Sequence, residues 1–272
     1  MLKRAQAYGL TFLYPEHDTA VGPCLTRHGE FARPQLDFLV NQASGEAGVF
    51  VDAGANIGTI SVPFARRRPD WRVLAIEAHR GLASILSANA LSNGCDRVEV
   101  IHAAAGPDRR IAEFPTLPLD ARVNVGTSSF YDRETPRLPV LMLPLDQIAP
   151  PDTRLVKVDV EGLEPEVLAG ATRLINEVRP TWFVEAFYQA HRAGVMETFL
   201  RAGYAVYWFY APWVTRAPLS GVRAEDDTVG DANFVCVPPG VAPAWALPPA
   251  RPEDQSWPTD YALYPYLKEY GY

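Results

Sequence analysis

The sequence has few cysteines, no long apolar run and no excess of positive charge, and each of these absences excludes a class of protein. Its three cysteines are widely spaced, which suits a reducing compartment, and no C-x-x-C pair or His–Cys cluster indicates zinc. No run is long enough to cross a bilayer, and the N-terminus lacks the pattern of a signal peptide. The net charge of −7 argues against nucleic acid or an anionic membrane as the main partner. We therefore expect a cytoplasmic protein that acts on small molecules.

Apolar residues make up 48% of the 272 residues, enough for one α/β domain with extensions. Buried-strand patterns alternate with helical ones, which is typical of a doubly wound parallel sheet. Strands are predicted at residues 49–52, 72–77, 98–103, 155–160, 182–185, 204–210 and 234–237, and helices at 31–43, 59–67, 82–91, 161–170 and 195–202. The last two strands have no helix between them, so we expect a mostly parallel, seven-stranded, Rossmann-like sheet with an antiparallel last strand.

Three segments are expected along the chain. Residues 1–44 form a cover and a helix, residues 45–240 form the main domain, and residues 241–272 form an extension rich in proline and aromatic residues. A disordered tail would be poorer in aromatic residues, so we expect this extension to pack on the domain or on a second subunit. The sequence therefore leaves open whether the protein forms a homo-oligomer. Residues 107–139 contain five prolines and predict a strand near 111–114 and a long loop near the active site.

The most informative stretch runs from Val49 to Ile60, where a buried strand leads through a turn of small residues into a helix. Gly54 and Gly58 let the backbone approach a ligand, and the helix would direct its free N–H groups toward that ligand. A dinucleotide fingerprint does not fit, because Asn56 stands where its second glycine would be. Together with Asp52 at the strand end, the spacing is D-x-G-x-N-x-G, as in class I S-adenosylmethionine (SAM) methyltransferases.

Two further features suit a nucleoside ligand. Glu77 ends the second strand of the domain, where a carboxylate can accept hydrogen bonds from both ribose hydroxyls. Ala104 and Ala105 follow the third strand and leave room for an adenine.

A second block, Lys157 to Gly162, supplies charged residues at the end of the fourth strand. Lys157 and Asp159 share one face of the strand, because strand side chains alternate. They could form a structural ion pair. Alternatively, Asp159 or Glu161 could act as a base, or both could bind a divalent cation together with Glu185. Lys157 could itself be the base if burial depressed its pKa.

Other candidate residues follow from side-chain chemistry. His191 is a candidate general base, with an exposed helix histidine as the alternative. Asn124, Ser128 and Ser129 could orient a polar acceptor, or they could simply hold their own loop. Trp213 could stack on a ring of the substrate, or it could pack in the core.

These residues and their order resemble the FkbM-type SAM-dependent methyltransferases over residues 45–240. The resemblance rests on Asp52 to Gly58, Glu77, residues 124–129 and above all the Lys157–Gly162 block. It implies methyl transfer from SAM, commonly to a hydroxyl of a sugar or natural product. The implied donor site is Asp52, Gly54, Asn56 and Gly58 near the methionine part, Glu77 and Ala78 beside the ribose, Ala104 and Ala105 beside the adenine, and Asp159 near the methionine amine or the acceptor. Ala78 replaces a proline that is frequent in relatives.

Three other functions remain in view. An N-methyltransferase would use the same donor site. An NAD-dependent oxidoreductase is disfavoured by the missing glycine, and a non-catalytic SAM-binding protein is disfavoured by Asp159 and Glu161. The acceptor cannot be read from the sequence.

Overall fold

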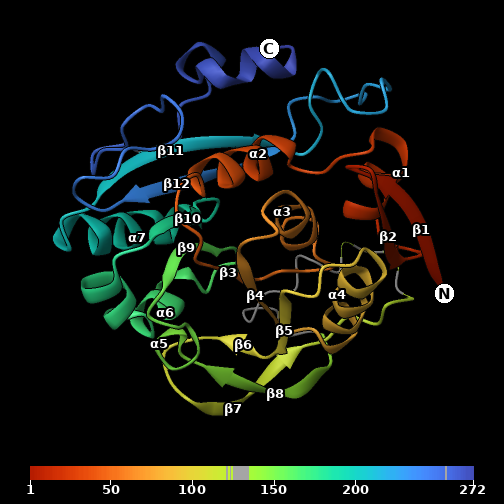
Figure 1. The fold of residues 1–272 in the computed structure, drawn as a ribbon, viewed down its shortest axis with the longest axis horizontal. Helices are drawn as coiled ribbons and strands as arrows, with labels where there is room; N and C mark the ends of the chain where they lie inside the picture. Colours follow the sequence, from red (N-terminus) through yellow and green to blue (C-terminus); the bar gives the residue numbers. More distant parts are fainter. Residues whose placement is uncertain (121, 123, 125–134, 255) are drawn as a thin grey trace.

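Five parallel strands lie at the centre of the protein, and two further strands extend them at one edge (Figure 1). The computed structural model describes residues 1–120, 122, 124, 135–254 and 256–272. In sheet order the strands are β11 (Ala205–Pro212), β12 (Gly230–Val237), β10 (Thr181–Glu185), β9 (Thr153–Val158), β3 (Val49–Ala53), β4 (Arg72–Glu77) and β5 (Val98–His102). Strand β12 is antiparallel to both of its neighbours, which confirms the predicted sheet.

Helices cover both faces of this sheet, so its central strands are largely buried and mostly apolar. Every residue of β3 and β10 is buried, as parallel strands in doubly wound folds require. The helices are α2 (Arg33–Gln42), α3 (Ser61–Arg67), α4 (Arg80–Ser92), α5 (Leu145–Ile148), α6 (Glu164–Ala169), a π-helical turn (Leu174–Val178) and α7 (Gln189–Arg201). Because crossovers are right-handed, α3 and α4 lie on one face and α6 and α7 on the other.

The direction of winding reverses between β3 and β9, which pair in parallel. The chain continues from β3 toward β4 and β5, but from β9 toward β10. In open α/β sheets the crevice for a ligand lies outside the carboxyl ends of the strands at such a switch point. We therefore expect the ligand site at the loops that follow Ala53 and Val158.

Smaller elements flank the sheet. At the N-terminus, a hairpin and a helix precede α2: β1 (Leu2–Ala7), β2 (Leu10–Pro15) and α1 (Val21–His28). After β5 comes a three-stranded sheet in the order β6 (Ala104–Ala105), β8 (Arg137–Leu143) and β7 (Arg110–Pro115). Two short 3₁₀ helices, Tyr261–Leu263 and Pro265–Tyr270, lie near the C-terminus. No helix in these described parts is long and apolar enough to span a membrane.

The tail contacts β11 through aromatic residues. The hydroxyl of Tyr266 donates to the carbonyl of Tyr210 at 2.7 Å and accepts from its N–H at 3.0 Å. Trp257 stacks on the ring of Tyr210, with 5.0 Å between ring centroids. Figure 1 shows the C-terminal end beside β11 and α2.

Two predicted element starts are wrong by four residues or more. Helix α7 begins at Gln189, six residues before the predicted start, because its first turns carry no apolar periodicity and lie largely exposed. Strand β12 begins at Gly230, so Asp231 belongs to a strand that pairs with β11 and not to a loop.

Candidate active site

The β3–α3 loop packs directly against the β9–α6 loop. Gly54 has a φ of +82°, and a Cβ there would lie 1.7 Å from the carbonyl oxygen of Asp159. Asn56 also has a positive φ, of 51°, and its Oδ1 accepts the N–H of Ile57 at 2.8 Å. Asparagine tolerates this left-handed backbone better than most residues. The D-x-G-x-N-x-G spacing thus lets the two loops touch beside a ligand crevice.

Glu77 lies at the end of β4, with its carboxylate facing that crevice. One oxygen accepts the N–H of Asn56 at 2.8 Å and the other accepts the N–H of His79 at 2.7 Å. Burial raises the pKa of Glu77 to about 7, although both hydrogen bonds act in the opposite direction. The two N–H groups fix the orientation of the carboxylate, which also lines the cavity.

Lys157 forms a buried bridge between two carboxylates. Its Nζ lies 3.3 Å from Oδ1 of Asp52 and 3.1 Å from Oδ2 of Asp159, and Ser61 donates to Asp52 at 2.6 Å. Burial alone would lower the pKa of Lys157, but the charges of Asp159 and Asp52 outweigh it and raise the pKa above its ordinary value. The pKa of Lys157 is thus not depressed by burial, and the geometry favours the structural ion pair over a role as base.

A cavity of about 430 Å³ opens above these loops. One half is lined by predicted donor residues, namely Asp52, Gly54, Asn56, Glu77, Ala78, Ala104 and Ala105. The other half, here called the reaction half, carries four acidic side chains and an indole, namely Asp159, Glu161, Glu185, Asp231 and Trp213. The structure thus brings most of the predicted site residues around one space.

Three acidic residues of the reaction half, Glu161, Glu185 and Asp231, have raised pKa values. Burial, assisted by the charge of Asp159, raises the pKa of Glu161 to about 8 and that of Asp231 to about 7. The same causes raise the pKa of Glu185 well above its ordinary value. Glu161 accepts a hydrogen bond from the Tyr188 hydroxyl at 3.0 Å, and Asp231 accepts one from Trp213 Nε1 at 2.7 Å.

Some predicted residues fall elsewhere. Gly58 is not among the described residues that line the cavity. A Cβ there would lie 2.3 Å from Leu86, so this glycine permits close packing of α3 on α4. His191 is not among the described residues that line the cavity either, and its ring stacks on Tyr188, with 6.1 Å between the ring centroids. Asn124 lines the cavity, whereas Ser128 and Ser129 lie outside the described residues.

The proposed cation ligands do not form a metal site. Across residues 1–120, 122, 124, 135–254 and 256–272, no group of three or more His, Cys, Asp or Glu side chains could hold a metal ion. Asp159, Glu161 and Glu185 share a cavity wall, but Asp159 is paired with Lys157 and Glu161 with Tyr188.

Comparison with known proteins agrees with this geometry. The family model described as "Methyltransferase FkbM domain" matches residues 52–206. The chain belongs to the FkbM methyltransferase family. A sequence search of the curated proteins returned no match.

Solved structures support the fold. An FkbM methyltransferase from Methylobacillus flagellatus is 18% identical with a TM-score of 0.47, over 70% of this chain and 44% of that one. This chain thus spans less than half of that protein. A precorrin 8w decarboxylase from Methanobacterium thermoautotrophicum is 16% identical with a TM-score of 0.50, over 82% of this chain and 98% of that one. A SAM-dependent methyltransferase from Agrobacterium tumefaciens is 10% identical with a TM-score of 0.51, over 88% and 70%.

The cofactor of this FkbM methyltransferase is SAM, and the donor half fits it. The cradle at Gly54 has no room for a Cβ, and the fixed carboxylate of Glu77 suits a ribose diol. Ala104 and Ala105 leave a flat apolar wall for an adenine. Family membership also favours methyl transfer over the oxidoreductase alternative.

Several site residues could not be identified from the sequence. Asp231 lies outside the strand predicted at residues 234–237, and no sequence motif marks Tyr188 as a site residue. Phe31 and Gln35 line the cavity from the N-terminal segment, far from the motifs. Glu164 holds the β9–α6 loop by accepting the N–H groups of Val160 and Gly162.

Replacing Glu77 with Gln is expected to weaken SAM binding by about 10–100-fold, because hydrogen bonds to a charged acceptor contribute about 1.5–3 kcal/mol. Since the pKa of Glu77 is about 7, its carboxylate is lost as the pH falls below that value. We therefore expect wild-type SAM affinity to fall between pH 8 and pH 6, and that of Glu77→Gln to stay flat. Calorimetry at both pH values measures this, with Glu99→Gln on exposed β5 as the control. A pH-independent wild type would contradict the assignment.

Proposed function

We propose that this protein methylates a hydroxyl group of a sugar-like or natural-product-type small molecule. The proposal rests on two carboxyl groups beside the donor half of the cavity, those of Glu161 and Asp231. Their pKa values are raised to about 8 and about 7, close to neutral pH. Hydroxyl groups hold their protons tightly, so O-methylation benefits from a base in contact with the acceptor.

When bound, SAM would supply the methyl group of its sulfonium to the acceptor oxygen in line, with its sulfur leaving as a neutral thioether. Glu161 is the best placed proton acceptor, since a base with a pKa near the working pH is the most effective. The hydroxyl of Tyr188 holds Glu161 in place through Oε2, and the carboxylate takes the acceptor's proton as the new C–O bond forms. The ion pair with Lys157 holds Asp159 beside the donor half. Holding the reactants in line supplies a large part of the rate enhancement.

Glu161 also shows signs of being held in place for function. Its φ is +54°, which is uncommon for a residue other than glycine, asparagine or aspartate. Such backbone strain is typically found at functional sites, where the surrounding structure compensates for it. Here Glu164 fixes both neighbours, through the N–H groups of Val160 and Gly162.

Replacing Glu161 with Gln is expected to lower kcat by about 100- to 10,000-fold, the usual contribution of a general base. The Kd for SAM should stay within threefold of the wild type. In the wild type, kcat/KM should rise with pH and level off above about pH 8, as Glu161 loses its proton. Glu197→Gln, an exposed change of the same kind on α7, is the control. An unchanged kcat in Glu161→Gln would remove Glu161 from the mechanism.

The function itself is tested in two steps. Calorimetry measures SAM binding, and a panel of hydroxylated and aminated small molecules is then incubated with methyl-labelled SAM. Mass spectrometry of the product shows whether the label lies on oxygen or on nitrogen. Absence of SAM binding would overturn the assignment, and label on nitrogen alone would overturn the hydroxyl acceptor.

One observation favours an amine as a second candidate acceptor. Four acidic side chains line the reaction half, and Lys157 is already paired with two carboxylates. Oε2 of Glu185 is buried and has no hydrogen-bond partner within the described parts of the chain. A protonated amine would satisfy this oxygen. The mass spectrometry above separates the two acceptors.

A further inference from the structure

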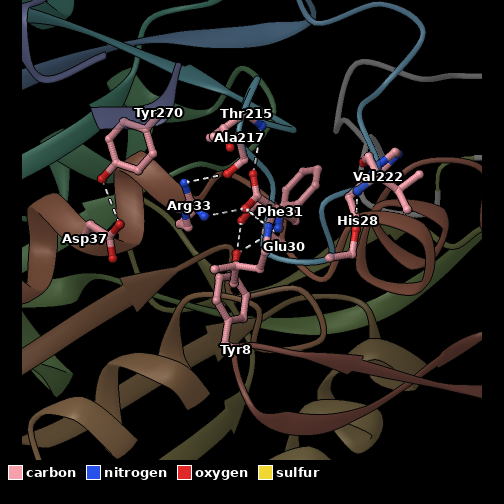
Figure 2. Close-up of polar contacts among 12 residues, drawn as sticks. Tyr8, His28, Glu30, Phe31, Arg33, Asp37, Thr215, Ala217, Val222 and Tyr270 are labelled. Atoms are coloured by element: carbon pink, nitrogen blue, oxygen red, sulfur yellow. Dashed lines mark hydrogen bonds and ion pairs between the residues drawn. The ribbon is translucent and has the colours of Figure 1, made fainter. Parts of the chain in front are cut away.

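The connection between β11 and β12 lies along the joint between α1 and α2. We call residues 213–222 the strap and residues 27–33 the joint. Figure 2 shows the polar contacts between them. Three carbonyls of the strap accept hydrogen bonds from the joint. The carbonyl of Trp213 accepts the N–H of Ala32 at 2.9 Å, and that of Ala217 accepts from Arg33 at 3.0 Å. The carbonyl of Val222 lies 2.6 Å from the ring nitrogen Nδ1 of His28.

Glu30 is the centre of this contact. Its side chain is fully buried, and its two oxygens accept the N–H groups of Thr215 at 2.7 Å and Leu219 at 3.1 Å. Arg33 neutralises the carboxylate at 3.0 Å and donates to the carbonyl of Ala217. A buried charge is costly unless it is paired and hydrogen-bonded, and this one meets both conditions. The side chain of Glu30 thus joins the N-terminal segment to the strap, although the two are far apart in the sequence.

The same contact sets one wall of the cavity. Phe31 and Trp213 both line it, and their ring centroids are 5.6 Å apart. The Tyr8 hydroxyl holds the backbone of Phe31 by donating to its carbonyl at 2.6 Å and accepting its N–H at 2.7 Å (Figure 2). Trp213 in turn donates to Asp231. The aromatic wall of the reaction half is therefore placed in part by groups that do not line the described cavity, such as Tyr8.

From these contacts we infer that Glu30 is a positioning residue, which fixes the strap on the joint so that Phe31 and Trp213 form the acceptor wall. Glu30 does not line the described cavity and acts only through these two rings. Its kinetic consequence rests on the proposed function. The placement of the strap can be tested without an acceptor.

Hydrogen exchange on the full chain provides that test. In Glu30→Gln the amide group brings a donor toward Arg33 and can accept only one of the two strap N–H groups. Peptides covering residues 213–222 should then exchange at least tenfold faster, while the rest of the chain stays within threefold. Once an acceptor is identified, its KM should rise at least tenfold, with the Kd for SAM within threefold.

Asp37→Asn is the matched control. Asp37 lies one turn after Arg33 on α2, pairs with Arg67 and accepts from the hydroxyl of Tyr270, a hydrogen bond that an asparagine can also accept (Figure 2). Strap exchange should not change in this variant. If Glu30→Gln does not fold, Arg33→Gln should still speed strap exchange at least threefold.

Unchanged strap exchange in the folded variant, or a rise in KM no larger than that of Asp37→Asn, would overturn the role of Glu30. A wild type that binds no SAM would instead overturn the proposed function, and the exchange comparison would still decide on Glu30.

Discussion

Replacing Lys157 with Met is expected to lower the free energy of unfolding by about 3–5 kcal/mol, the usual effect of removing one partner from a buried ion pair. Lys157 has only 4% of its side chain exposed and is the cation between Asp52 and Asp159. Without it, the hydroxyl of Ser61 is the one side-chain partner left to the buried carboxylate of Asp52 among the residues that the structure describes. Methyl transfer should also be lost, because Asp159 would no longer be held beside the donor half. Urea denaturation at pH 7 measures the loss of stability.

The choice of pH follows from the direction of the pKa shift. The pKa of Lys157 is raised in the folded protein, so its stabilising contribution is complete below the ordinary value of 10.5 and is lost only as the pH rises beyond the folded value. The double variant Asp52→Asn, Lys157→Met removes the uncompensated charge and should recover about half of the lost stability. A Lys157→Met variant as stable as the wild type would show that this lysine does not compensate buried charge.

The donor half could be predicted because its signals are local. The strand, turn and helix around Asp52 and Gly54 follow one another in the sequence, and Glu77 ends the next strand. Parallel strands buried on both faces are continuous apolar runs, so their ends were easy to find. Once the strands were placed, the chemistry at their carboxyl ends followed from the topology.

The reaction half could be predicted only in part, because it depends on tertiary contacts. Asp231 comes from a strand whose polar first residues resemble a loop. Phe31 and Trp213 meet because Glu30 joins segments that are 185 residues apart in the sequence. His191 follows Glu185 closely along the chain, yet it is not among the described residues that line the cavity. Closeness in sequence to Glu185 therefore does not place His191 at the cavity. The contact between Phe31 and Trp213 cannot be predicted from the sequence, because the two residues are far apart in it.

Replacing Gly54 with Ala is expected to weaken SAM binding at least 100-fold and to lower the free energy of unfolding by about 3 kcal/mol. The new Cβ would lie 1.7 Å from the carbonyl oxygen of Asp159, so one of the two loops must move by more than an ångström. The φ of +82° adds strain of about 1–2 kcal/mol for any residue with a Cβ. Moving either loop separates Asp52 from Asp159 and disturbs both halves of the site. Calorimetry and urea denaturation measure the two effects.

Gly240→Ala separates the backbone strain from the collision. Gly240 has the same φ of +82°, but a Cβ there would meet no atom within 4 Å. This control should lose only about 1–2 kcal/mol of stability and keep its affinity for SAM. A Gly54→Ala variant that bound SAM as tightly as Gly240→Ala would mean that the two loops need not touch for the cofactor to bind. Loss of SAM binding in Gly54→Ala but not in Gly240→Ala would show that the cofactor site requires the absence of a Cβ at residue 54. The backbone freedom of glycine would then matter less.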